Sequence, residues 1–301
     1  MSDRVLLAIS MAIGETMAPE SPVLASWELG LRLRERREAT GLTSTAAAKH
    51  ARCTQGYVSD VERGKTKIAP EKLDALLAAY ELADEEVAEL RELRARANTR
   101  GWWQAYSGIF DQTVLRYIGC EHGAESVQTH ETLLIPGLLQ TEAYGRALFH
   151  GTPNYRLTEV DPRIEARLAR QRRLFDEEPL HLTAVVNEGA LRQQVGGPEV
   201  LKAQLRHLLE VAEERSGNVD IRVVPFAAGG YDGLGASTYH LLDFPGARLP
   251  SLLYLENLTI MEIAERPDLV RQYSYALREA LDLALSSHDS LALIKRVETE
   301  L

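Results

Sequence analysis

Apolar residues in the first third of the chain recur at helical spacing within short segments. Leu29 and Leu33 form one stripe, and that segment ends at Gly41, a residue type that favours the end of a helix. Gly64 ends a later segment in the same way. Residues that favour a helix start open the other segments, namely Thr43 or Ser44, Thr54, Pro70 and Asp84. The pattern predicts a compact bundle of five short helices over residues 28–97.

The later part of the chain alternates apolar runs with amphipathic segments. Residues 181–187 and 219–226 have the apolar character of strands, and residues 197–217 between them have helical spacing. This order predicts a βαβ unit, in which the two strands lie parallel. Residues 237–245 and 251–257 predict two further short strands that extend the sheet as a meander.

Two apolar runs around a turn precede the βαβ unit. Thr132–Ile135 predicts a strand, Pro136-Gly137 a turn, and Thr141 the start of a helix. A long helix is predicted from Pro162 to Phe175, and the chain is again helical from Pro267 onward. We therefore predict a mainly α protein with an α+β part, in which the five-helix bundle is followed by an α+β domain with a small mixed sheet. The expected boundaries are an N-terminal extension at 1–27, the bundle at 28–97, an aromatic linker at 98–110 and the α+β domain at 111–301.

Charge is distributed unevenly along a chain whose formal net charge is −10. Residues 28–70 carry nine Lys or Arg against five acidic residues, a net of +4, whereas residues 71–301 sum to −12. Acidic surface repels phosphate. Contact with nucleic acid is therefore expected within the first hundred residues, and the acidic remainder is expected to serve another purpose.

The two cysteines, Cys53 and Cys120, are far apart and belong to no Cys/His cluster. This usage predicts neither a disulfide scaffold nor a structural zinc site, and it fits a reducing cytoplasm. The apolar run Val5–Ile13 is about half as long as a bilayer span requires, and no small-residue cleavage site follows it. We therefore expect a cytoplasmic protein without a membrane segment.

Residues 42–67, LTSTAAAKHARCTQGYVSDVERGKTK, combine two capped helices with a tight link and a glycine-ended turn followed by basic residues. This segment resembles the helix-turn-helix of lambda-repressor-like, XRE-type regulators, and the resemblance covers residues 28 to about 83. In that family the second helix of the motif, here Gln55–Glu62, lies in the major groove of DNA.

The resemblance places three residues at base-reading positions. Gln55 falls on the first, where its amide can pair with adenine, and Gly56 offers close approach of the backbone. Asp60 can accept a hydrogen bond from a cytosine amine, although its charge repels phosphate. The resemblance also implies a partly buried ion pair between Arg37 and Glu62. The predicted DNA-contacting residues are Ser44, Thr54, Gln55, Gly56, Tyr57, Ser59, Asp60, Arg63, Lys65 and Lys67.

A second resemblance covers residues 110–300. The segments YIGCEHGAESVQTHETLLIPGLLQTEAYGRAL and VVPFAAGGYDGL resemble the C-terminal domain of WhiJ-like, antitoxin-like regulators of high-GC Gram-positive bacteria. The resemblance implies a transcription regulator, either a repressor or an antitoxin-like protein, whose partner is a small protein encoded by the adjacent gene. Because one short module makes few base contacts, we expect a homodimer on a double-stranded DNA operator.

Catalytic chemistry has little support in the sequence. Glu121-His122 and Asn187-Glu188 supply carboxylates and an imidazole, but the chain has no nucleophile elbow, no phosphate-binding loop and no paired-histidine zinc motif. We therefore predict no catalytic residue, no metal site and no cofactor. The alternative is a ligand-processing enzyme that carries a helix-turn-helix appendage.

Trp102, Trp103 and Tyr106 place three large rings between the bundle and the acidic body. Two interpretations stay open, because the rings either pack the linker onto the body or form a wall of a ligand or peptide groove. We predict them as residues that bind a ligand or partner controlling the DNA response. A later basic run is expected to be a solvated helix face, consisting of Arg163, Arg167, Arg170, Arg172 and Arg173.

Overall fold

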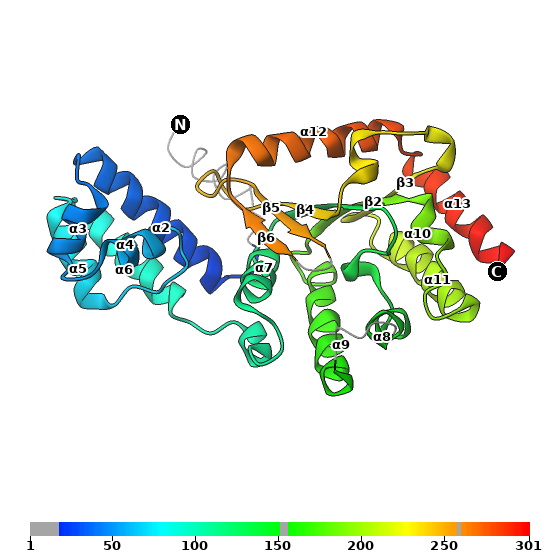
Figure 1. The fold of residues 1–301 in the computed structure, drawn as a ribbon, viewed down its shortest axis with the longest axis horizontal. Helices are drawn as coiled ribbons and strands as arrows, with labels where there is room; N and C mark the ends of the chain where they lie inside the picture. The colour runs from blue at the N-terminus through cyan, green and yellow to red at the C-terminus, as the bar shows by residue number, and fades with distance from the viewer. Residues whose placement is uncertain (1–17, 151–155, 258–259) are drawn as a thin grey trace, which may run out of the picture.

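The computed structural model describes residues 18–150, 156–257 and 260–301. Most of the expected N-terminal extension, residues 1–17, lies outside this part of the chain. A helical bundle lies at one end of the molecule, and a sheet with helices on both faces forms the rest (Figure 1). The protein is thus mainly α with an α+β second domain, as the hydrophobic pattern predicts.

Five helices form the bundle in the predicted order, and they are α2 Pro22–Ala39, α3 Ser44–His50, α4 Gln55–Glu62, α5 Pro70–Ala79 and α6 Asp84–Ala97. Two predicted caps are present, since Thr43 Oγ1 accepts from the Ala46 N–H and Thr54 Oγ1 from the Tyr57 N–H, both at 3.2 Å. Asp84, expected as a cap, is instead the first residue of α6, where its charge suits the positive end of the helix dipole. All five helices contribute to the bundle core, which includes Leu33, Ala47, Val58, Leu76 and Leu90.

The first helix begins at Pro22, inside the stretch expected to be an extension. Ser21 Oγ donates to the Gly119 carbonyl at 2.7 Å, which attaches the start of α2 to the second domain. Trp27 is 1% exposed and packs edge-on against Phe244 of that domain, with ring centroids 5.6 Å apart. Because Leu33 of the same helix is buried in the bundle, α2 belongs to two cores and joins the domains directly.

The second domain is built on a six-stranded mixed sheet in the order β3-β2-β1-β4-β5-β6. The strands β1 (Ser126–Glu131), β2 (His181–Asn187) and β3 (Val219–Val224) are parallel, which confirms the predicted βαβ unit. The remaining strands follow as an antiparallel meander, of which the last was not predicted. They are β4 Thr238–Asp243, β5 Leu252–Glu256 and β6 Met261–Ala264.

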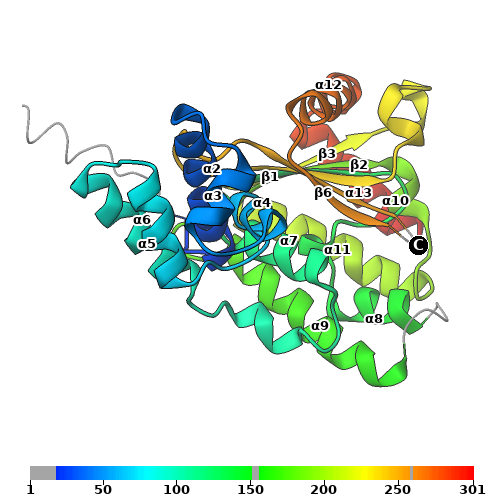
Figure 2. The same ribbon diagram turned by 60° about the vertical axis from the view of Figure 1, so that its left-hand side comes forward.

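Helices cover both faces of this sheet (Figures 1 and 2). One face carries α12 (Pro267–Leu283), and the other carries α7 (Gln112–His122), α9 (Leu157–Gln171) and their neighbours. The other helices of this domain are α8 Glu142–His150, α10 Glu188–Arg192, α11 Pro198–Glu214 and α13 Ser287–Glu300. Short 3-10 helices are η1 Trp102–Tyr106, η2 Gly137–Leu139, η3 Arg172–Leu174, η4 Phe226–Ala228 and η5 Asp232–Gly235.

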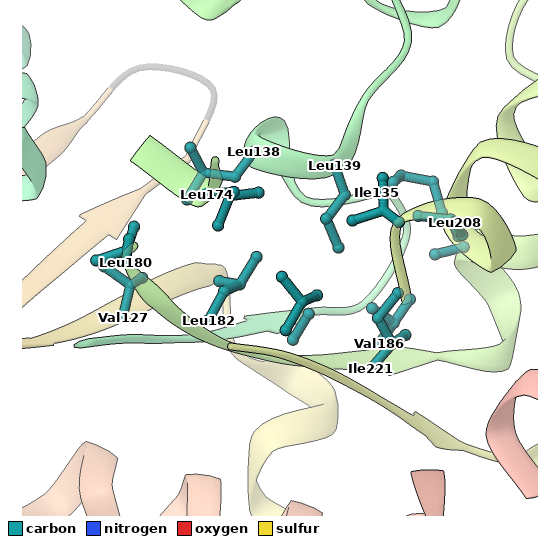
Figure 3. Packing of buried hydrophobic residues seen from close by; sticks show 14 of the residues in the cluster. Val127, Ile135, Leu138, Leu139, Leu174, Leu180, Leu182, Val186, Leu208 and Ile221 are labelled. Atoms are coloured by element: carbon teal, nitrogen blue, oxygen red, sulfur yellow. The ribbon is translucent and has the colours of Figure 1, made fainter. Parts of the chain in front are cut away.

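The main core lies between the sheet and the helices of the face opposite α12. Leu182 and Val186 of β2 and Ile221 of β3 lie on the sheet side of this layer (Figure 3). Leu139 and Leu208 lie on the helix side (Figure 3). This layer of aliphatic side chains holds α11 and η2 against the parallel strands.

The prediction of a strand over Thr132–Ile135 is wrong. The strand is Ser126–Glu131, a polar sequence that hydrogen-bonds to β2 on one side and to β4 on the other. Its central position satisfies its backbone groups on both edges, and this pairing compensates for its low apolar content. The long helix also begins earlier than expected, at Leu157, with Pro162 inside it.

Candidate nucleic-acid interface

The buried face of α4 fixes the orientation of the motif. Val58 and Val61 of α4 lie in the bundle core. Arg52, in the link between α3 and α4, takes a left-handed φ of 49°, which makes the tight turn between the two helices. The opposite face begins with Gln55 and Gly56, which are exposed. Gln55 and Gly56, which the family resemblance places at base-reading positions, are thus open to solvent.

Side chains on this exposed face are held by local hydrogen bonds. Gln55 Nε2 donates to Ser59 Oγ at 2.8 Å, which aligns the amide along the helix. Arg63 donates to Asp60 Oδ1 at 2.8 Å and offsets the charge that would repel phosphate. Because both partners are largely exposed, this ion pair contributes little to stability, and Arg63 can exchange it for a phosphate contact.

Tyr57 is turned away from the base-reading positions. Its hydroxyl donates to the Lys67 carbonyl and accepts from the Ala69 N–H, both at 3.3 Å. The Lys72 ammonium lies 4.4 Å from the centre of the ring. Tyr57 therefore holds the loop after α4 in place, which is a positioning task within the predicted DNA-contacting set.

The predicted ion pair between Arg37 and Glu62 is confirmed. Arg37 Nε donates to Glu62 Oε1 at 2.6 Å and Nη2 donates to Oε2 at 3.0 Å, while Nη1 donates to the Leu42 carbonyl at 2.9 Å. Both residues are buried. The hydrogen bond to Glu62 is the main reason that the pKa of Arg37 is raised above its ordinary value. The pair attaches α2 to the end of α4 and so orients the recognition helix.

The other predicted DNA-contacting residues lie at the start of α3 and on both sides of α4 in the chain. Ser44 is the half-buried first residue of α3, and Thr54 caps α4 with its hydroxyl oxygen. Lys65 and Lys67 are exposed in the loop after α4. The Lys67 ammonium donates to the Thr99 carbonyl at 3.3 Å, and burial lowers the pKa of this lysine. Lys67 therefore connects the loop after α4 to the segment that leads to the second domain.

An open cleft of about 930 Å³ lies between the two domains. Its walls come from the start of α2, the loop after α4, residues 98–104, the first half of α7, and β6. Arg116 of α7 spans the junction, since Nη2 donates to Glu265 Oε1 at 2.6 Å and to the Arg63 carbonyl at 3.3 Å. Arg63, the residue that follows α4, is thus in direct contact with the second domain.

The three rings of the aromatic segment contact one another in series, since Trp102 lies edge-on to both Trp103 and Tyr106, but they differ in burial. Trp103 is 1% exposed, packs against His122 with ring centroids 5.2 Å apart, and lines the cleft. Trp102 and Tyr106 are half-buried, lie edge-on to each other, and are not among the cleft-lining residues. Trp103 is thus a core residue that packs the linker onto the body and also forms part of the cleft wall, and the binding of a ligand or partner by these rings stays a prediction.

Two family models match the chain. Residues 28–90 match a family described as "Helix-turn-helix domain". Residues 114–296, well over half of the chain, match a family described as "Domain of unknown function (DUF5753)". The chain belongs to the DUF5753 family. Neither a curated protein nor a solved structure matches it. The N-terminal match makes this DUF5753 protein a helix-turn-helix regulator that binds DNA.

The basic run of the DUF5753 domain is not a solvated helix face. Arg170 donates through Nε and Nη2 to the two carboxylate oxygens of Glu121, each at 2.7 Å. Arg173 is buried and donates to the carbonyls of His122, Ala124 and Glu178. The expectation fails because α9 and η3 pack against the end of α7, so that carboxylate and carbonyl oxygens replace water around these guanidinium groups. Arg172 is exposed as expected.

Glu121 is the centre of a buried polar cluster. The Tyr117 hydroxyl donates to Glu121 Oε2 at 2.7 Å and lies 3.3 Å from His240 Nδ1. Burial opposes ionisation of Glu121, but attraction to Arg170 and the hydrogen bonds outweigh it and lower the pKa of this carboxyl. Burial lowers the pKa of His240 to about 4. At neutral pH the cluster is therefore a neutral imidazole beside an ionised, fully paired carboxylate.

The other chemically notable groups of the domain are enclosed. Burial raises the pKa of Glu131 to about 8 and the pKa of Cys120, which lies within α7, to about 12. Glu188, at the end of β2, accepts from the Phe226 N–H and pairs with Arg192. Over residues 18–150, 156–257 and 260–301, no three His, Cys, Asp or Glu side chains are grouped to hold a metal. None of the helices that the structure describes is long and apolar enough to cross a membrane.

Proposed function

We propose that this DUF5753 protein is an XRE-type transcription regulator that reads a double-stranded DNA operator with α4. The observation that carries the proposal is the exposed first turn of α4, supported from behind by Val58, Val61 and the buried Arg37–Glu62 pair. An amide at Gln55 can form two hydrogen bonds with an adenine edge in the major groove. The net charge of +4 over residues 28–70, against −12 over residues 71–301, favours the approach of DNA to this face.

Gly56 supports the same conclusion through packing. A Cβ built at Gly56 meets nothing closer than Thr54 Oγ1 at 4.0 Å, so the fold itself has room for a side chain there. Gly30, by contrast, would place a Cβ 2.4 Å from the Val61 carbonyl oxygen, and its small size is required by the contact of α2 with α4. Glycine lowers helix stability relative to alanine. A glycine without an internal packing reason on this exposed face is expected where a partner approaches the backbone closely.

The proposed phosphate contacts come from Arg63, Lys65 and Lys67 on one side of α4 and from the start of α3 on the other. Such contacts fix the position of the helix but carry no sequence information. With few base-reading residues in each copy, we propose that a homodimer binds a two-fold operator and gains affinity through effective concentration. This regulator would act in the cytoplasm on the DNA that it controls.

We further propose that the DUF5753 domain receives a signal, from a small protein encoded by the adjacent gene or from a small ligand, and that the protein acts as a repressor or antitoxin-like regulator. A regulatory rather than a catalytic role is supported by the state of its reactive groups. Glu121 is paired with Arg170, Glu188 is paired with Arg192, and the Cys120 thiol is protonated at neutral pH.

Fluorescence anisotropy of the full chain with labelled duplexes from the region upstream of its own gene tests the proposal. Gln55→Ala should cost about 1–3 kcal/mol of binding free energy and relax the preference at one adenine. Lys65→Ala should weaken binding to all sequences alike and reduce the salt dependence. Lys202→Ala on α11 removes the same charge far from α4 and serves as the control. Unchanged affinity and preference in Gln55→Ala would show that α4 does not read the DNA.

A further inference from the structure

The interdomain cleft concentrates positive charge on an otherwise acidic protein. Lys65 and Lys67 come from the loop after α4, Arg100 from the connecting segment, and Arg116 from α7. The carboxylate of Glu262 also lines the cleft, and Arg116 is paired with Glu265 at its edge. Four cations from three separate segments thus meet in one cavity, although residues 71–301 sum to −12.

The same cleft has an apolar wall. Val23, Leu115 and Ile263 line it together with Trp103. Trp103 is 1% exposed, and its indole Nε1 has no hydrogen-bond partner among the residues that the structure describes. This N–H is itself enclosed, so the cleft offers an apolar wall, rather than a free donor, beside its positive charge.

We propose that this cleft binds a small organic anion, with a carboxylate or phosphate group near Lys67, Arg100 and Arg116 and an apolar part against Trp103, and that this ligand weakens operator binding. The second half of the proposal rests on the proposed DNA-binding function. Guanidinium and ammonium groups form charge-assisted hydrogen bonds with either anionic group. A volume of about 930 Å³ accommodates a metabolite-sized molecule.

The antagonism follows from residues that belong to both sites. Lys65 and Lys67 line the cleft and are also the proposed phosphate contacts of the recognition loop. An anion bound there neutralises these charges and places negative charge beside the path of the DNA backbone. Arg116 adds a mechanical link, because it donates to the carbonyl of Arg63 at the end of α4. By linkage, DNA must weaken ligand binding by the same factor.

The site is tested first without DNA, on the full chain, with anilinonaphthalene sulfonate as an anionic aromatic probe whose fluorescence rises on binding. Thr113→Phe fills the cleft and Arg100→Gln removes one charge, and each should weaken probe binding roughly tenfold or more. Thr158→Phe, at an exposed position of α9, and Arg172→Gln are the matched controls and should bind the probe as wild type does. Equal affinity in cleft and control variants would overturn the site.

Displacement of the probe identifies the anionic group. Phenylacetate and phenyl phosphate carry the same ring with a carboxylate or a phosphate, and preferential displacement by one assigns the group that the cleft selects. Displacement by neither at millimolar concentration would overturn the assignment of an organic anion.

The regulatory half is tested by anisotropy with the upstream duplex at saturating probe. We expect the apparent Kd for DNA to rise roughly 5- to 150-fold, the usual range of allosteric coupling. Thr113→Phe should bind DNA normally and lose this response. Unchanged DNA affinity while the probe occupies the cleft would overturn the antagonism and leave the site standing. Absence of DNA binding without the probe would instead overturn the proposed function and, with it, the antagonism.

Discussion

The helix-turn-helix bundle and the DUF5753 domain use arginine in opposite ways. In the bundle, Arg52 and Arg63 are exposed near α4, where a phosphate group can reach their guanidinium groups. In the DUF5753 domain, Arg170 is paired with buried Glu121, and Arg173 binds three main-chain carbonyls. The same residue type is therefore open to an external partner in one domain and binds groups within the fold in the other.

This contrast shows why counting charges identified the basic segment at 28–70 but did not reveal that arginines of the DUF5753 domain are buried. The net charge of +4 over residues 28–70 marks a surface, because most of its cations stay in solvent. The arginines of 163–173 resemble a second basic surface in sequence, but their partners lie elsewhere in the chain. Arg37, buried with Glu62 inside the bundle, shows that exposed and buried arginines can occur within one domain.

The largest expected effect comes from breaking the internal use of arginine. Glu121→Ala leaves the Arg170 guanidinium without its carboxylate and should lower the free energy of unfolding by about 3–5 kcal/mol. Arg172→Ala, an exposed neighbour, should change it by less than about 0.5 kcal/mol. Urea denaturation measures both. Similar small losses in the two variants would mean that Arg170 behaves as a surface residue and would remove the contrast.

A second test concerns Glu131, another buried carboxyl of the domain. The pKa of Glu131 is raised from 4.5 to about 8, so the folded state holds this proton at pH values where the unfolded chain releases it. Stability from this group is fully present below pH 4.5 and is lost as pH rises through about 8, by up to about 5 kcal/mol.

Denaturation of wild type and Glu131→Gln at several pH values isolates this contribution. The histidines act in the opposite direction, since the lowered pKa of His130 and His240 makes stability rise from about pH 4 to 6.5. The difference between the two proteins should therefore grow between pH 5 and 8 in favour of the Gln variant. A difference that stays constant over this window would contradict a buried, protonated Glu131.

A double-mutant cycle on Arg37 and Glu62 tests the buried ion pair of the bundle. We expect a coupling of about 2–3 kcal/mol, because each single change leaves the other charge partly buried. Arg34 and Glu38, an exposed pair on the same helix, provide the control cycle and should couple much more weakly, because solvent screens the two charges. Additive losses for Arg37 and Glu62 would show that the pair is no stronger than the exposed one.

The smallest expected effect separates stability from function on α4. Gly56→Ala should raise the free energy of unfolding by about 0.5–1 kcal/mol, since the helix gains propensity and the added Cβ meets no close atom. The same variant should bind DNA more weakly, because the methyl group occupies the approach of the backbone to the groove. Thermal denaturation and anisotropy measure the two effects. A variant that gains stability and keeps full affinity would leave Gly56 without a role in DNA contact.

Local signals account for the parts of the molecule that were predictable. The caps at Thr43 and Thr54, the helix start at Pro70 and the glycine-ended turn at Gly64 each act through neighbouring residues, so the bundle and its α4 face follow from the sequence. The βαβ unit is predictable for a similar reason, since its alternation of strand and helix limits the topology. Ser126–Glu131 escaped prediction because its pairing partners lie more than fifty residues away, at β2 and β4.

The sequence by itself thus determined the helix-turn-helix, the βαβ unit and the first two strands of the meander in the DUF5753 domain, and the separation of a basic segment at 28–70 from an acidic remainder. Tertiary structure decided which charges are available. It paired Glu121 with Arg170 across 49 residues, joined the domains through Trp27, and gathered Lys67, Arg100 and Arg116 around one cleft. Such outcomes depend on contacts between distant segments, and the solvation of a charge is fixed when those segments pack together.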